Sequence, residues 1–134
     1  MTLVSEAMNR SPVIIGPEAE LTEAAALLAA TQAAHLLVVD EGNLVGILCR
    51  CDVRDTTPDE RVADRMAVPV MTVRPDATLE EAALTMQDCG VGCVPVALGG
   101  LVLGTISAEE LERAGLEPPA HRHCHDPGEA SRAC

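Results

Sequence analysis

The stretch Pro17-Glu-Ala-Glu-Leu-Thr-Glu-Ala-Ala25 recurs 58 residues later as Pro75-Asp-Ala-Thr-Leu-Glu-Glu-Ala-Ala83. The same offset, without gaps, aligns 11 identities over residues 4–54. The identities outside the two stretches are Val4/Val62, Met8/Met66, Val38/Val96, Gly42/Gly100 and Gly46/Gly104. A fixed period of this length indicates two copies of one supersecondary unit, each of which needs the other to cover its apolar face.

Each copy is predicted to have the order β-α-β-β-α. The repeated stretch begins a helix, because Leu21, Ala24, Ala25 and Leu28 fall on one helical face, and their equivalents in the second copy do the same. Thr78 followed by Glu81 is the spacing of a capping box. The expected strands are Val13–Ile15, Leu36–Val39 and Leu44–Leu48 in the first copy, and Val70–Val73, Val94–Ala97 and Leu101–Ile106 in the second.

A short helix closes each copy, over Asp52–Asp55 in the first and Ala108–Ala114 in the second. The pattern therefore predicts a mixed α/β (α+β) fold. We divide the chain into repeat 1 over residues 1–58, repeat 2 over residues 59–115, and a flexible polar tail over residues 116–134.

Composition excludes several classes of function. The chain of 134 residues has no Phe, Tyr or Trp, so it offers no aromatic platform on which bases could stack. A net charge of −12 opposes binding to nucleic acid and to anionic membranes. We find no secretory signal and no apolar run long enough to span a bilayer, so we expect a cytoplasmic protein with six reduced cysteines.

The order, spacing and duplication of these motifs resemble a pair of cystathionine β-synthase (CBS) domains, over roughly residues 4–115. The resemblance implies two β-α-β-β-α repeats packed sheet to sheet with pseudo-twofold symmetry. It also implies a non-catalytic regulatory module that forms a homodimer or acts on a protein partner. In such pairs a cleft between the repeats binds AMP, ATP, S-adenosylmethionine or a similar adenine-containing ligand. The sequence has no nucleophile elbow, P-loop or dinucleotide fingerprint, which agrees with a non-enzymatic role.

The resemblance also locates candidate ligand-binding residues at the turn after the last strand of each repeat. The family signature places a hydroxyl three residues after a glycine and a carboxylate three residues later. In the first repeat Asp52 is present, but Cys49 replaces the hydroxyl; in the second Ser107 is present, but Glu110 replaces aspartate. Neither copy is complete.

Helix capping is an equal alternative for these residues, because Ser107 and Glu110 have capping-box spacing and Asp52 is a first-turn acid. His35 and Cys93 share one repeat position, where related proteins often carry a basic residue, so His35 is either a phosphate contact or a half-buried structural histidine. Arg50 is either a phosphate contact or an exposed surface charge.

An alternative function is a metal- or redox-responsive interaction protein. The tail contains a cluster of zinc-type ligands, namely His121, His123, Cys124 and His125. The cysteines near the first signature, Cys49 and Cys51, are one residue apart and do not have the spacing of a zinc knuckle. The alternative interpretation of the tail is a flexible polar end that binds metal only weakly.

Overall fold

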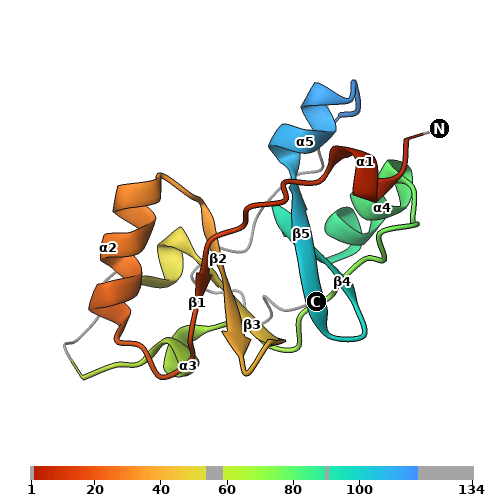
Figure 1. The fold of residues 1–134 in the computed structure, drawn as a ribbon. Coiled ribbons are helices and arrows are strands. Elements are labelled where there is room, and N and C mark those ends of the chain that lie inside the picture. Colours follow the sequence, from red (N-terminus) through yellow and green to blue (C-terminus); the bar gives the residue numbers. More distant parts are fainter. Residues whose placement is uncertain (1, 54–58, 90, 118–134) are drawn as a thin grey trace. The chain divides into compact units, whose positions relative to one another are not determined.

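The computed structural model describes residues 2–53, 59–89 and 91–117. The chain forms two compact units (Figure 1). The middle unit comprises residues 12–70, and the outer unit joins residues up to 11 to residues from 71 onward. The described helices and strands divide between the two units, and each unit has its own sheet and its own apolar core.

The middle unit has a three-stranded sheet in the order β1-β2-β3. Strand β1 runs parallel to β2, and β2 is antiparallel to β3. Its elements are β1 (Ile14–Ile15), α2 (Leu21–Thr31), β2 (His35–Asp40), β3 (Asn43–Cys49), the 3-10 helix η1 (Arg50–Val53) and α3 (Val62–Arg65). The buried core consists of Ile15, Leu21, Ala24, Leu28, Leu36, Val38, Leu48 and Val62.

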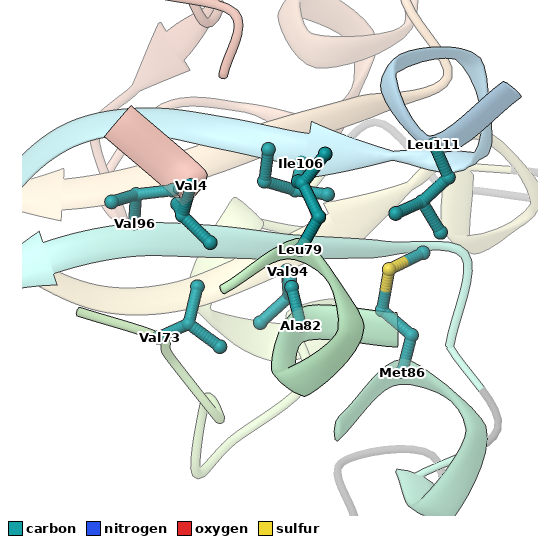
Figure 2. Close-up of a cluster of buried hydrophobic side chains, with 9 residues drawn as sticks. All are labelled: Val4, Val73, Leu79, Ala82, Met86, Val94, Val96, Ile106 and Leu111. Carbon is teal, nitrogen blue, oxygen red and sulfur yellow. The ribbon is translucent and has the colours of Figure 1, made fainter. Parts of the chain in front are cut away.

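The outer unit has a two-stranded antiparallel sheet, β4-β5. Its elements are α1 (Val4–Ala7), α4 (Leu79–Cys89), β4 (Cys93–Leu98), β5 (Leu101–Ser107) and α5 (Ala108–Arg113). The core side chains gather between α4, the two strands and α5, as Figure 2 shows. They are Val4, Val73, Leu79, Ala82, Met86, Val94, Val96, Ile106 and Leu111.

The structure confirms the predicted mixed α/β fold and most of its elements. The helical faces that the 3.6-residue period indicated are the buried ones, for example Leu21, Ala24 and Leu28 of α2. Thr78 and Glu81 exchange the two hydrogen bonds of a capping box at the start of α4, at 3.1 and 2.7 Å. Both hairpins form, with positive φ at the turn glycines Gly42 and Gly100.

Two boundaries differ from the sequence prediction. The expected strand Val70–Val73 is reduced to a single parallel bridge between Val73 and Val96. The helix expected over Asp52–Asp55 begins earlier, as η1 from Arg50, and has 3-10 geometry. Asp55 lies outside the described residues. The chain turns tightly here because the backbone N–H of Arg50, the first residue after β3, donates to the carbonyl of Ala34 at 3.0 Å. Short turns of this kind commonly have 3-10 geometry.

The short helix that opens each repeat packs in the unit formed mainly by the other repeat. Val4 of α1 is buried in the outer unit, and its N–H donates to the Ala77 carbonyl at 2.8 Å. Val62 of α3 is buried in the middle unit, and its N–H donates to the Ala19 carbonyl, also at 2.8 Å. The two repeats thus exchange their first helices. The units of structure therefore differ from the repeats in sequence, whose limits remain a prediction.

Candidate functional site

A buried carboxylate organises the turn after β3 in the middle unit. Asp52 is only 6% exposed. Its Oδ2 accepts a hydrogen bond from the N–H of Cys49 at 2.7 Å, across the start of η1. A charge-assisted bond of this kind is about twice as strong as one between neutral groups. The carboxylate therefore fixes the turn that holds the first copy of the signature.

The sheet register brings a second candidate residue to this turn. His35 opens β2 and is the cross-strand partner of Cys49, the last residue of β3. Residues paired in this way have Cβ atoms about 5 Å apart. His35 therefore lies beside Cys49, whose N–H is bound by Asp52, and this pairing was not predicted from the sequence.

Arg50 is directed toward the end of α2. Its Nη2 donates to the carbonyl of Ala33 at 2.9 Å and to that of Gln32 at 3.3 Å. Gln32 is the C-cap of α2 and has a left-handed conformation, with φ of 58°. A cation at a helix C-terminus satisfies carbonyls that lack intrahelical partners and complements the helix dipole. This side chain thus has a clear structural role.

The outer unit repeats the arrangement at the turn after β5. Glu110 is 6% exposed, and its Oε1 accepts hydrogen bonds from the Ser107 N–H at 2.7 Å and from the Ser107 hydroxyl at 2.6 Å. Cys93 lies opposite Ser107 in the β4-β5 register. The carboxylate thus caps the first turn of α5, which is the structural role that capping-box spacing suggested.

The two turns combine different side chains at equivalent positions. Asp52 is one methylene shorter than Glu110 and accepts the backbone N–H of the residue three positions before it. Glu110 accepts both the N–H and the hydroxyl of its equivalent partner. Each carboxylate is therefore already engaged by its own turn, whether or not a ligand also contacts it.

Cys49 has a buried side chain. Burial, which removes water from the thiolate, raises the pKa of Cys49 above 9.0, and the nearby Asp52 charge acts in the same direction. Its sulfur lies 3.3 Å from the sulfur of Cys51. The expectation of six reduced cysteines stays a prediction.

A pocket that the sequence did not predict lies beside this turn, between α2 and η1. Its volume is about 430 Å³. It is lined by Ala25, Leu28, Ala29, Gln32, Arg50 and Val53. The small alanine side chains on α2 leave this space open. The alanine-rich run was the available signal, but we interpreted it only as a face that packs on the sheet.

The predicted metal ligands His121, His123, Cys124 and His125 lie outside the described residues. Within residues 2–53, 59–89 and 91–117, no group of three or more His, Cys, Asp or Glu side chains is arranged to hold a metal ion. None of the helices in those ranges has the length and apolar character needed to cross a membrane.

Comparison with known proteins supports the family resemblance. A family model described as "CBS domain" matches residues 4–58 and 62–117. The CBS domain pair of protein MJ0100, solved in complex with 5′-methylthioadenosine and S-adenosyl-L-methionine, is 27% identical with a TM-score of 0.80, over 86% of this chain and 96% of that one. The cytosolic domain of the Mg²⁺ channel MgtE, solved in complex with ATP, is 28% identical with a TM-score of 0.76, over 84% of this chain and 48% of that one.

Curated relatives are much longer proteins. One named homoserine O-acetyltransferase, from Methanococcus vannielii, is 30% identical over 117 residues, which are 81% of this chain and 24% of the relative. The chain thus spans about a quarter of the length of that relative.

Proposed function

Because this chain belongs to the CBS domain family, we propose that it is a non-catalytic regulatory module that binds an adenine-containing ligand at the turn holding Asp52. The observation that carries the proposal is the buried carboxylate at the end of the last strand of each repeat. Asp52 occupies the signature position whose carboxylate holds ribose hydroxyls in related proteins. The turn that presents it is fixed by the Cys49 N–H, so the carboxylate is held in place before a ligand arrives.

Two neighbours in structure support the ligand class. The MJ0100 domain pair was solved with two adenosyl compounds, and the MgtE domain with ATP. The identities are 27% and 28%, over more than four-fifths of this chain. The shared part of these ligands is adenosine, and we propose that this chain recognises the same part.

A regulatory role fits the extent of the curated match. The relative named as an acyltransferase is matched over about a quarter of its length, so its activity does not transfer to this chain with the match. We propose that ligand binding changes how the module acts on itself or on a protein partner. Homodimer formation and a regulated partner remain part of this proposal, and sedimentation velocity with and without ligand tests the first.

Binding by the full chain tests the proposal. We expect S-adenosylmethionine, 5′-methylthioadenosine, AMP or ATP to bind, as measured by isothermal titration calorimetry. At a hundredfold excess over the dissociation constant the bound ligand stabilises the fold by about 2.7 kcal/mol. Asp52→Asn should weaken the ligand that binds by about tenfold, because an amide loses the charge-assisted bonds to ribose hydroxyls.

Asp76→Asn is the matched control, because Asp76 is an exposed aspartate paired with Arg74 on the surface of the outer unit. It should leave affinity unchanged. Melting curves of both variants separate loss of binding from loss of fold. If the wild-type chain binds none of the four compounds at millimolar concentration, the proposed function is wrong.

A further inference from the structure

We propose that Arg65 is a positioning residue of the candidate site. Its guanidinium, held by Glu60, fixes the turn that carries Asp52 and in this way sets the affinity for the ligand. The effect on affinity rests on the proposed function, whereas the effect on the turn can be measured without any ligand. All three residues belong to the middle unit, although Arg65 and Glu60 fall in the second repeat of the sequence.

The side chain of Arg65 joins α3 to the turn after β3. Its Nε donates to Oε2 of Glu60 at 2.6 Å and its Nη2 donates to Oε1 at 3.0 Å, which makes a bidentate pair. Its Nη1 donates to the backbone carbonyl of Asp52 at 3.3 Å. The side chains of Arg65 and Glu60 are 34% and 22% exposed, so solvent screens this pair less than an ion pair on the open surface. The bidentate pair therefore holds the guanidinium in the plane from which it reaches η1.

Both members of the pair stand on anchored backbone. Arg65 is the last residue of α3, whose Val62 is fully buried in the core of the middle unit. The carbonyl of Glu60 accepts the N–H of Leu21 at the start of α2, at 3.0 Å. A side chain supported in this way imposes its position on a neighbouring turn, because its own backbone has little freedom to follow that turn.

Asp52 is thus held through two of its groups. Its Oδ2 accepts the N–H of Cys49 at 2.7 Å, and its main-chain carbonyl accepts Nη1 of Arg65. Binding groups work best when they are held within about 0.5 Å of the productive geometry. A bond to the main chain of Asp52, added to the bond to its side chain, restricts the turn more than either bond alone. This restriction lowers the cost of ordering the turn when a ligand binds.

The turn of the outer unit is held differently. The repeat offset of 58 residues aligns Arg65 with Ala7, whose methyl side chain has no hydrogen-bond donor. In that unit the carbonyl of Glu110 accepts the N–H of Ala114, at the end of α5, at 3.2 Å. The outer turn is therefore held by the helix that follows it, whereas the middle turn is held from α3. Substituting Arg65 should loosen the middle turn and leave the outer one unchanged.

Amide hydrogen exchange on the ligand-free full chain, followed by NMR, tests the effect on the turn. Arg65→Met keeps most of the stem and removes the guanidinium. We expect the N–H of Cys49 to exchange about tenfold faster in this variant, because the turn that protects it opens more often. The N–H of Ser107 in the outer turn should keep its rate. So should the N–H of Leu37, which donates to the Val13 carbonyl within the sheet of the middle unit, at 2.9 Å.

Arg61→Met is the matched control. It removes the same charge from the residue that precedes α3, but the side chain of Arg61 bonds the Glu18 carbonyl and lies 4.0 Å from the Glu20 carboxylate. In this variant the N–H of Cys49 should exchange at the wild-type rate. The control therefore separates the bond to Asp52 from the loss of one positive charge near α3.

Calorimetry with 5′-methylthioadenosine, S-adenosylmethionine, AMP and ATP as separate titrants tests the effect on affinity. Arg65→Met should weaken the compounds that bind by about fivefold, which is the loss expected for one hydrogen bond. Arg61→Met should change affinity by less than about twofold. Glu60→Gln should have a smaller effect of the same kind, because it loosens the fork. The double variant of Glu60 and Arg65 should bind no more weakly than Arg65→Met alone, since Glu60 acts through Arg65.

The outcomes separate this inference from the proposed function. An unchanged exchange rate at Cys49 overturns the inference, and so does equal acceleration at Cys49 and Leu37, which would mean that Arg65 stabilises the whole unit. Additive losses of affinity in the double variant also overturn it. If the wild-type chain binds none of the four compounds, the proposed function is wrong, and exchange at Cys49 still decides whether Arg65 fixes the turn. If Arg65→Met does not fold, Glu60→Gln decides by the same measurements.

Discussion

Substituting Gly104 and Gly46 by alanine should have unequal effects, although the two glycines occupy the same position in the two repeats. A Cβ at Gly46 would lie 2.5 Å from Sδ and 2.9 Å from Cγ of Met66. A Cβ at Gly104 would lie 2.9 Å from Sδ of Met8, but also 2.5 Å from the backbone oxygen of Asn9. The first contact is mainly with a flexible side chain, whereas the second includes the main chain.

The magnitudes follow from what each site must move. Overpacking costs about 1–3 kcal/mol, and a methionine side chain that swings aside keeps Gly46→Ala near the lower end, at about 1 kcal/mol. At Gly104 the neighbouring backbone is held by two hydrogen bonds, Asn9 N to Thr105 O at 2.9 Å and Thr105 N to Asn9 O at 3.0 Å. Weakening both adds about 1–3 kcal/mol, so Gly104→Ala should cost about 3 kcal/mol.

Thermal unfolding followed by circular dichroism measures the difference. For a chain of 134 residues, 1 kcal/mol corresponds to about 4 °C. We therefore expect the Tm to fall by about 4 °C in Gly46→Ala and by about 12 °C in Gly104→Ala. Gly16→Ala is the control, because nothing lies within 4 Å of its added Cβ. It should be neutral or stabilising by about 0.5 kcal/mol, since alanine restricts the unfolded chain.

Amide exchange shows where the damage lies. In Gly104→Ala the amides of Asn9 and Thr105 should exchange faster, because they form the bridge that the new methyl group displaces. If Gly104→Ala melts no lower than Gly46→Ala, then the backbone of Asn9 yields as easily as a methionine side chain, and the reasoning is refuted.

Three further predictions concern other features of the structure. Val4→Ala removes a fully buried side chain and should cost about 2 kcal/mol of stability, with faster amide hydrogen exchange in the outer unit, although Val4 precedes the strands of the first repeat. Val62→Ala should likewise destabilise the protein, with faster amide hydrogen exchange in the middle unit. If each substitution instead speeds hydrogen exchange only in the unit nearest to it in sequence, the swapped positions of α1 and α3 are contradicted. Because burial raises the pKa of Cys49, the stability that this thiol contributes should be complete below pH 9.0 and be lost as the pH rises above that value. Denaturation curves of Cys49→Ser should therefore show a smaller loss of stability at high pH than those of the wild type. Identical pH profiles for the two proteins would argue against this explanation. The Arg74 guanidinium lowers the pKa of Asp76 below 3.8, so the stability contributed by this pair is present above pH 3.8 and is lost as the pH falls. In Arg74→Gln, NMR titration should show the pKa of Asp76 returning toward 3.8. An unchanged titration curve would contradict the pairing.

Local patterns in the sequence were sufficient for most elements of the fold. Period-3.6 faces, the Thr78–Glu81 cap and the glycine hairpins depend on neighbours within a few residues, and the structure contains them all. Neither α1 nor α3 was predicted, and so neither was their exchange, because a four-residue helix is too short to leave a clear periodic pattern or to show which sheet it will meet. Val4 and Val62 align in the repeat, but alignment shows equivalence and not location.

The candidate residues divide in the same way. The sequence named Asp52, Ser107 and Glu110 as candidates, together with His35, Cys49 and Cys93. The pairing of His35 with Cys49 and of Cys93 with Ser107 across the strands comes from the sheet register and was not predicted, because the repeat offset aligns His35 with Cys93 instead. It could not show that Arg50 turns toward α2, because the direction of a long side chain depends on carbonyls 17 and 18 residues earlier in the chain. The pocket between α2 and η1 was missed for a related reason, since it arises from two elements that are apart in sequence.

The chemistry of the two turns limits how such a module distinguishes ligands. Each carboxylate is satisfied by the turn that carries it, and Glu110 uses its extra methylene to accept a hydroxyl as well as an N–H. An anionic oxygen on the ligand would compete with the carboxylate for the N–H and O–H donors of the turn. A hydroxyl on the ligand would instead donate to the carboxylate, which can accept several hydrogen bonds at once. Ribose offers such donors and phosphate does not. Selection by donors on the ligand, with acceptors fixed on the protein, therefore requires no rearrangement of either turn.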